Sequence, residues 1–176
     1  MKKIIASLLF SAAFLSGTAQ IQRKLSAYVS ALYSKTLYDR TMGNNLLGFG
    51  AGFQMFYNNK THFKPTIELT GTASLEDDLV YRMNLDGSEI PTARGMINLF
   101  AGTTFHPVKN VALSFVAGPS FINGQTLLGI KPSLDFYFGK NRRWMAKASF
   151  INIYNRDKVT REDFGSVSLA IAVKLF

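Results

Sequence analysis

The residue types that could carry catalysis are scarce in this chain. It has no cysteine and only two histidines, His62 and His106, which both fall in predicted turns. A histidine works as a general base beside a nucleophile or an orienting carboxylate, and neither histidine has such a partner nearby in the sequence. We therefore interpret both as exposed turn residues, and we expect no catalytic residues and no enzyme activity.

Candidate ligands for a metal ion or a phosphate group are equally weak. Asn84, Asp86 and Glu89 faintly resemble a calcium-binding loop, but the ligand series is incomplete. The acidic run at residues 76–78 is interpreted as a solvated loop, with cation-mediated bridging to an anionic surface as the alternative. The glycine-rich run at residues 48–52 precedes no helix, so it does not predict a phosphate-binding loop. We expect no metal site and no cofactor.

Most of the chain is predicted to be strand, because apolar residues alternate along it with small or polar ones. In the final segment, Val167, Leu169 and Ile171 alternate with Ser168 and Ala170. A lone strand leaves its backbone groups unpaired, so each such segment needs partners on both sides. Eight strands are predicted, over residues 24–35, 46–57, 63–75, 95–105, 111–121, 127–138, 144–154 and 165–176.

The N-terminal residues have the pattern of a secretory signal peptide. Two lysines precede an apolar run at residues 4–15, and residues 17–19 form a small-x-small cleavage site. We expect residues 1–19 to be removed and residues 20–176 to form one domain. The chain is 47% hydrophobic and only 18% charged, yet no stretch after the leader is long and apolar enough for a transmembrane helix. An exported apolar chain of this kind can enter a membrane as a closed barrel.

The arrangement of the strands predicts such a barrel. Sequential strands with alternately shorter and longer connections form an antiparallel meander, although the connection after the fifth strand is ambiguous. The second face of the strands is mostly Gly, Ser, Thr and Ala, which suits a narrow interior better than a wall facing water. With these features and the terminal Phe176, residues 25–176 resemble the small eight-stranded outer-membrane β-barrels of Gram-negative bacteria, the class of OmpX and the OmpA transmembrane domain. The predicted fold class is all-β, an eight-stranded antiparallel up-and-down transmembrane β-barrel.

A few isolated charges fall on the face that would point inward. Because an unpaired charge in a confined lumen is costly, we expect these carboxylates and lysines to pair with one another. Such a lumen charge network would plug the barrel, and a remnant of a polar pathway is the alternative. The glycines at 48–52 would leave room for the inward rings of Tyr28, Phe100 or Tyr137. The network residues are Glu68, Lys131, Asp135, Lys147 and Lys174.

Charge also differs between the predicted ends of the barrel. The formal net charge is +9, but export makes nucleic acid an unexpected partner. Predicted periplasmic turns carry bases without acids, whereas predicted outer loops carry nine of the eleven acids. A periplasmic basic rim would face anionic headgroups, each charge contributing about 1 kcal/mol near such a surface; lysine-rich turns that only aid solubility are the alternative. The rim residues are Lys60, Lys64, Lys109, Lys140, Arg142 and Arg143.

Aromatic residues fall near the predicted strand ends. Such rings favour the interface between a membrane and water, so they predict two girdles, although aromatics also flank turns in other β proteins. The girdle residues are Tyr33, Tyr57, Phe63, Phe105, Phe121, Phe138, Trp144, Tyr154 and Phe164.

The resemblance implies a non-enzymatic integral outer-membrane protein that serves envelope integrity or surface interaction, such as adhesion, through extracellular loops. Its partners would be outer-membrane lipids and lipopolysaccharide, together with an envelope protein or a host surface, and it would be a monomer or a subunit of a larger complex. Three alternatives stay open: a narrow pore, an accessory subunit of a larger outer-membrane complex, and a soluble periplasmic lipocalin-like ligand-binding barrel. The soluble barrel would turn its aliphatic rows inward, so the direction of those rows separates it from the others.

Overall fold

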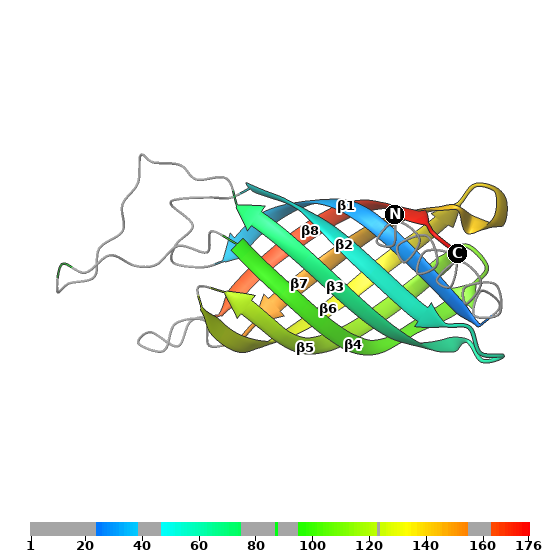
Figure 1. Ribbon diagram of the computed structural model, residues 1–176, viewed down its shortest axis with the longest axis horizontal. Coiled ribbons are helices and arrows are strands. Elements are labelled where there is room, and N and C mark those ends of the chain that lie inside the picture. Colours follow the sequence, from blue (N-terminus) through cyan, green and yellow to red (C-terminus); the bar gives the residue numbers. More distant parts are fainter. Residues whose placement is uncertain (1–23, 39–46, 75–86, 88–94, 123, 155–162) are drawn as a thin grey trace, which may run out of the picture.

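Strands make up nearly all of the described chain. A computed structural model describes residues 24–38, 47–74, 87, 95–122, 124–154 and 163–176. Within these ranges no helix is long and apolar enough to cross a membrane. The elements are β1 (Leu25–Tyr38), β2 (Leu47–Tyr57), β3 (Phe63–Ser74), β4 (Gly95–Val108), β5 (Val111–Ile122), β6 (Gln125–Phe138), the 3-10 helix η1 (Lys140–Arg142), β7 (Trp144–Ile153) and β8 (Phe164–Lys174) (Figure 1).

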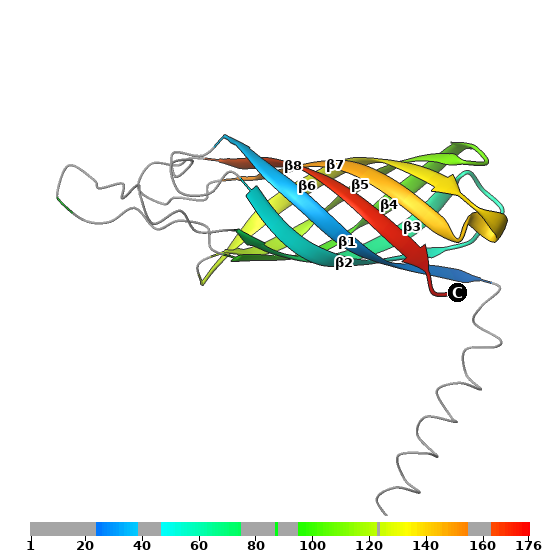
Figure 2. The same ribbon diagram turned by 90° about the horizontal axis from the view of Figure 1, so that it is seen from above.

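The strands close into one up-and-down barrel. Each strand pairs antiparallel with the next one in sequence, and β1 also pairs with β8 (Figures 1 and 2). Closure gives every strand two partners, which removes the unpaired edges that these segments would otherwise expose. The prediction of an eight-stranded antiparallel barrel is confirmed.

The barrel has two different ends. The loop end, at the left of Figure 1, is where β1, β3, β5 and β7 end. The turn end, at the right, receives the connections that follow β2, β4 and β6, which are residues 58–62, 109–110 and 139–143. The connection after β5, which the sequence left ambiguous, comprises only residues 123–124.

The outer and inner faces of the wall differ sharply in polarity. Successive side chains of an extended strand point to opposite faces, so each strand contributes to both. On the outer face, Phe49 is 53% exposed, Leu169 is 65% exposed and Ile171 is 53% exposed. On the inner face, Tyr28 is 2% exposed and the carboxylate residue Asp135 is fully buried. The aliphatic rows therefore point away from the barrel axis, as the strand pattern predicted.

Some strands extend beyond their predicted ends. β4 continues to Val108, because a register shift after Phe105 lets Val108 pair with Val111 of β5. This extension places His106 inside a strand and on the inner face, where it is buried. The prediction that His106 is an exposed turn residue was therefore wrong, whereas His62 lies exposed in its turn.

Two prolines inside strands sit where the hydrogen-bond ladder is interrupted. The β4–β5 pairing skips two residues on each strand, and Pro119 is one of them. The β6–β7 pairing does the same, and Pro132 is one of the skipped residues. Because proline has no backbone N–H to donate, these gaps allow both prolines to remain within the wall.

One of the inward aromatic rings packs against a glycine outside the run at residues 48–52. The three rings expected inside are all buried there: Tyr28, Phe100 and Tyr137. Phe100 lies against Gly129 of β6, where an added Cβ would come within 2.9 Å of the ring atom Cζ. Gly50 of β2 instead allows close strand approach, because a Cβ there would lie 2.1 Å from a backbone oxygen of β3. At Gly48, Gly50 and Gly52 the three atoms nearest to an added Cβ belong to β1 or β3 and to none of these rings.

Candidate functional site

A cluster of buried charges lies inside the barrel. Glu68 of β3 forms ion pairs with Lys131 of β6 and Lys147 of β7, the second with a Nζ–Oε2 distance of 2.5 Å. Lys147 also lies 3.9 Å from Oδ1 of Asp135. These side chains are at most 6% exposed. We call Glu68, Lys131, Asp135 and Lys147 the central ion cluster.

Neutral side chains complete the hydrogen bonding around this cluster. Ser114 donates a hydrogen bond of 2.7 Å to Oδ2 of Asp135. The Ser114 hydroxyl lies 3.0 Å from that of Thr104, which in turn lies 2.7 Å from the hydroxyl of Thr66. Lys147 also donates to the side-chain oxygen of Gln54, at 3.3 Å. Such continuous networks hold buried charges in one arrangement.

Apolar side chains fill the lumen on both sides of the central ion cluster. The loop-end cluster consists of Met96, Phe100, Val116, Ile122, Ile151, Ile153 and Phe164. The turn-end cluster consists of Tyr28, Phe56, Ala112, Tyr137, Met145 and Ala172. Glu68 pairs across strands with Phe100 of the first cluster, and Asp135 pairs with Ala112 of the second. The buried charges therefore lie between two apolar layers of the lumen.

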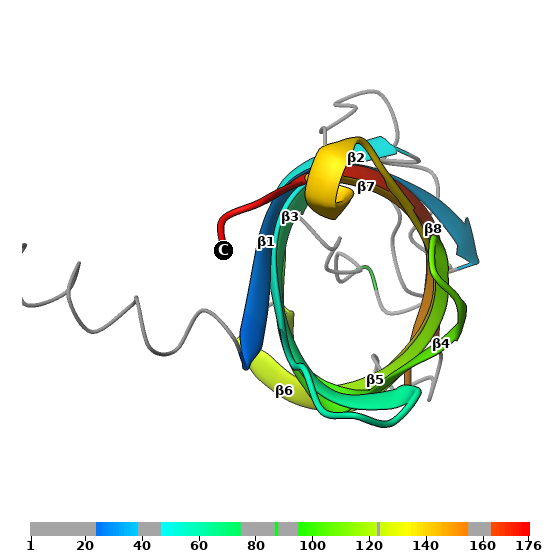
Figure 3. The same cartoon turned by 90° about the vertical axis from the view of Figure 1, so that its right-hand side faces the viewer.

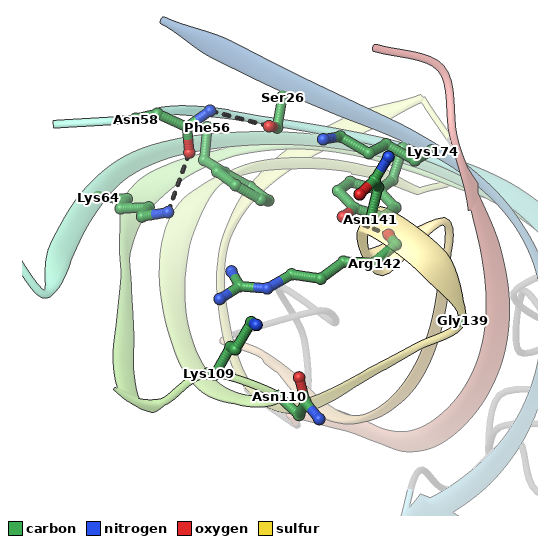
Figure 4. Close-up of a pocket in the computed structure, with 11 residues that line it drawn as sticks. Ser26, Phe56, Asn58, Lys64, Lys109, Asn110, Gly139, Asn141, Arg142 and Lys174 are labelled. Carbon is green, nitrogen blue, oxygen red and sulfur yellow. Dashed lines mark hydrogen bonds between the residues drawn. The ribbon is translucent and has the colours of Figure 1, made fainter. Parts of the chain in front are cut away.

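A cationic pocket opens at the turn end, beyond the turn-end cluster. It has a volume of about 580 Å³, and none of the described residues that line it is acidic. Four cationic side chains line it, from β3, the β4–β5 turn, η1 and β8: Lys64, Lys109, Arg142 and Lys174 (Figure 4). Asn58, Asn110 and Asn141 add amide groups to the walls. We call this cavity the mouth pocket.

Helix η1 holds Arg142 over the opening. It lies at the rim when the barrel is viewed along its axis from the turn end (Figure 3). Asn141 and Arg142 both have left-handed backbone angles, with φ of 57° and 54°. The carbonyl oxygen of Arg142 accepts a hydrogen bond of 2.9 Å from the Tyr28 hydroxyl, which ties η1 to β1. The Arg142 guanidinium then extends across the mouth, 5.8 Å from the centre of the Tyr137 ring.

Lys64 is also fixed in place, on the opposite wall. Its Nζ donates a 2.9 Å hydrogen bond to Oδ1 of Asn58 and lies 5.3 Å from the centre of the Phe56 ring. Asn58 in turn donates from Nδ2 to the hydroxyl of Ser26, at 2.8 Å (Figure 4). The pocket therefore has positioned cations, an aromatic floor and a polar wall.

The predicted charged residues fall into groups that differ from the predicted lumen network and basic rim. Four of the five predicted network residues form the central ion cluster, but Lys174 lies in the mouth pocket. Of the predicted basic rim, Lys64, Lys109 and Arg142 also line that pocket, whereas Lys60, Lys140 and Arg143 lie exposed outside it. Tyr28 was expected inside the barrel, but its support of η1 was not predicted, and neither were Asn58 and Asn141 in the pocket wall. The bases Lys140, Arg142 and Arg143 were the only local signal that marked the region.

Most of the predicted girdle residues lie near the ends of the barrel. Those exposed at the turn end are Tyr57, Phe63, Phe138 and Trp144, and those exposed at the loop end are Phe121 and Tyr154. Tyr33 is exposed on the outer face but pairs with Leu169 in the middle of β8, so it lies away from the loop end. Phe105 is half-buried and stacks on Phe63 with ring centres 4.8 Å apart. Phe164 is only 6% exposed and packs in the loop-end cluster, so its place in the girdle was predicted wrongly. It shares the inward face of β8 with Ser166, Ala170 and Ala172.

The inner histidine belongs to the aromatic floor. His106 stacks on Tyr137 with ring centres 5.7 Å apart and meets Phe56 edge-on. His62 donates a 2.9 Å hydrogen bond from Nδ1 to the carbonyl oxygen of His106, and so braces the turn. The candidate calcium ligands Asn84, Asp86 and Glu89, and the acidic run at 76–78, lie outside the described residues.

No protein-family model and no curated protein sequence matches this chain. Solved structures are similar in fold. Ail, the attachment invasion locus protein of Yersinia pestis, in complex with the heparin analogue sucrose octasulfate, has a TM-score of 0.53 and 13% identity, over 86% of this chain and 98% of that chain. The Yersinia pestis outer membrane protein Ail in a phospholipid bilayer nanodisc has a TM-score of 0.53 and 14% identity, over 85% and 99%. Neisserial surface protein A has a TM-score of 0.54 and 12% identity, over 85% and 95%. This chain therefore has the fold of the small eight-stranded outer-membrane β-barrels, as its strand pattern predicted.

Proposed function

We propose that this chain is an integral outer-membrane barrel without enzymatic activity, which acts at the cell surface through the connections at its loop end. The observation that carries the proposal is the reversed polarity of the wall. Large apolar side chains such as Phe49, Phe115 and Leu169 are half or more exposed, while Glu68, Lys131 and Asp135 are buried inside. In water this arrangement is unfavourable, whereas in a bilayer the outer face meets hydrocarbon.

Location and partners follow from the same arrangement. Residues 1–19 would direct export, and the loop end would face outward with lipopolysaccharide and outer-membrane lipids around it. The likeness to Ail and to Neisserial surface protein A, whose names refer to attachment and to a surface, supports a surface interaction such as adhesion. Because the sequence identities are only 12–14%, this support rests on the shared fold alone.

A non-enzymatic role agrees with the chemistry of the inner side chains. A catalytic carboxylate or lysine needs access to substrate, but Glu68 and Lys131 are enclosed by apolar layers and neutralise each other. His106 packs between rings instead of facing a nucleophile. The same enclosure disfavours a narrow pore, so we expect no steady conductance in planar bilayers.

Two substitutions on the outer face test the membrane assignment. Leu169 lies in the middle of β8, paired with Tyr33 and Ala148, whereas Leu175 lies beyond the strand end at the turn end. A charge at the bilayer midplane costs about 2–4 kcal/mol and one near the interface about 0–1 kcal/mol. We expect Leu169→Arg to impair refolding into lipid vesicles and Leu175→Arg to leave it nearly unchanged.

Fractionation gives the complementary measurement. The wild-type chain should remain with membranes after an alkaline wash and should migrate differently on gels before and after boiling. Recovery in the aqueous fraction, together with improved solubility of Leu169→Arg, would contradict the proposal and favour a soluble ligand-binding barrel. Copurification of a stoichiometric envelope protein after mild extraction would instead indicate an accessory subunit.

The surface role is tested separately from the fold. Cells that express the chain would be compared in an adhesion assay with cells that express a variant in which residues 77–92 are replaced by a Gly-Ser linker. We expect adhesion to fall while the boiling-dependent migration stays the same. Equal adhesion by both strains would contradict a role for this connection without affecting the membrane assignment.

A further inference from the structure

The mouth pocket concentrates positive charge that the protein itself does not compensate. Among the described residues, none of its four cations, Lys64, Lys109, Arg142 and Lys174, forms an ion pair. Like charges that share one opening repel each other, which opposes folding unless an anion binds between them. The chain nevertheless directs all four toward the same cavity from four different elements.

The shape of the pocket depends on an unfavourable backbone conformation in η1. Two successive non-glycine residues, Asn141 and Arg142, adopt left-handed backbone angles, which usually occur singly and cost free energy. The hydrogen bond from Tyr28 to the Arg142 carbonyl, and that from the Lys174 backbone N–H to the Arg143 carbonyl at 2.8 Å, maintain this conformation. The result is an arginine side chain extended over the mouth and not turned outward to solvent (Figure 4).

We propose that the mouth pocket binds a compact polyanion that carries phosphate groups, which goes beyond the proposed membrane and surface role. Arginine presents paired N–H donors that match phosphate oxygens, and lysines add point charges. The asparagine amides of the wall supply further donors for oxygens that the cations do not reach. A volume of about 580 Å³ falls within the range of small-molecule sites, about 300–1,000 Å³. Four cations suit a ligand with several negative charges better than a single carboxylate.

Calorimetric titration with inorganic pyrophosphate tests this site directly. The barrel would be refolded in nanodiscs of zwitterionic phosphatidylcholine, with a chelator present to exclude metal bridging. We expect one binding site in the wild type and at least about ten-fold weaker binding in Lys109→Gln/Lys174→Gln, because half of the cationic charge is removed. That pair leaves η1 unchanged, and Arg142→Gln provides an independent test that should also weaken binding.

A matched double substitution distinguishes binding in the pocket from nonspecific attraction to the positive charge at the turn end. Lys60→Gln/Lys140→Gln removes the same charge from exposed positions outside the pocket, and we expect an unchanged Kd. Equal weakening by both pairs would show that only diffuse attraction operates and would overturn the proposal. Absence of binding to the wild type at millimolar pyrophosphate would overturn it as well. Boiling-dependent migration of every variant reports the barrel, so a folding failure is distinguishable from a binding failure.

The phosphate groups could belong to a soluble molecule or to a lipid headgroup, and a competition experiment distinguishes these sources. The titration is repeated in nanodiscs that contain anionic phosphatidylglycerol, at an ionic strength where surface charge is screened within about 8 Å. A headgroup that enters the pocket would weaken pyrophosphate binding at least about ten-fold, as expected for direct competition. Unchanged binding would assign the pocket to a soluble polyanion. Both results support a phosphate site.

Discussion

The central ion cluster and the mouth pocket place the same residue type in two opposite situations. Lys131 and Lys147 lie in the middle of the lumen, and each forms an ion pair with Glu68. Lys64 and Lys174 point into the same barrel at its turn end, where the part of the chain that the structure describes places no carboxylate in the cavity lining. A lysine sealed between apolar layers must have a partner, because desolvation is costly, whereas a lysine at an open mouth keeps water. A lysine whose charge is neutralised by a carboxylate therefore indicates a structural role. A lysine without such a partner indicates a surface available for an anionic ligand.

The largest expected loss of stability comes from removing the carboxylate that pairs with both lysines of the central ion cluster. Glu68→Gln would leave Lys131 and Lys147 inside the lumen with only Asp135 nearby. Removing one partner of a buried ion pair typically costs about 3–5 kcal/mol. We expect the free energy of unfolding, measured by guanidinium titration of the vesicle-inserted barrel, to fall by that amount.

A compensated double variant serves as the control for this prediction. Glu68→Met/Lys131→Met removes one charge of each sign and leaves Lys147 near Asp135. Because an apolar replacement of a buried pair is often neutral, much of the lost stability should return. If Glu68→Gln unfolds like the wild type, the cluster has no structural role and the contrast with the mouth pocket disappears.

A smaller effect is expected at the second carboxylate. Asp135 lies 3.9 Å from Lys147, whereas Glu68 lies 2.5 Å from the same nitrogen, so Asp135 is the weaker partner. Asp135→Asn would still deprive Ser114 of a charged acceptor at 2.7 Å. We expect a loss of about 1–3 kcal/mol in the same unfolding titration. A loss larger than that of Glu68→Gln would reverse the assigned order of the two carboxylates.

The apolar layer beside the cluster can be tested by overfilling it. In Gly129→Ala the new Cβ would lie 2.5 Å from the Ser120 hydroxyl and 2.9 Å from the Phe100 ring. Overpacking of this kind costs about 1–3 kcal/mol, and Phe100→Leu in the same chain should recover part of it. Gly71→Ala is the matched control, because no atom lies within 4 Å of its added Cβ. Equal stability of both variants would show that the layer is not tightly packed.

The smallest effect on stability is expected at the mouth. Lys109 is exposed on the β4–β5 turn, and surface substitutions away from special features rarely change stability much. Lys109→Gln should therefore leave the unfolding midpoint unchanged while it weakens pyrophosphate binding. A marked loss of stability with unaltered binding would place this lysine with the structural charges.

The strands themselves were predictable because their signal is local. Alternation with a period of two marks both the strand and its outward face, so residues such as Leu169 and Ile171 were assigned correctly. The same rule applied to β8 would also have turned Phe164 inward with Ser166, but its position at a strand end had suggested an interfacial ring. His106 was misassigned because the β4 extension depends on pairing with β5.

The division of the charged residues could not be predicted in the same way. Alternation correctly turned Lys131, Lys147 and Lys174 inward, yet it carries no information on their height along the barrel axis. That height depends on strand tilt and register, which closure of the barrel sets. Lys174 consequently joined the mouth pocket, with Arg142 and Lys64 from strands or turns remote in sequence.

By itself the sequence determined which segments are strands and which side chains share a face, since both follow from neighbours one or two positions away. Only the tertiary structure decided which charges neutralise each other, because the Glu68–Lys131 contact joins residues 63 positions apart in the chain. It likewise decided that four cations from separate elements share one opening. The physical reason is that ion pairs and pockets depend on distances across the lumen, and barrel closure sets those distances.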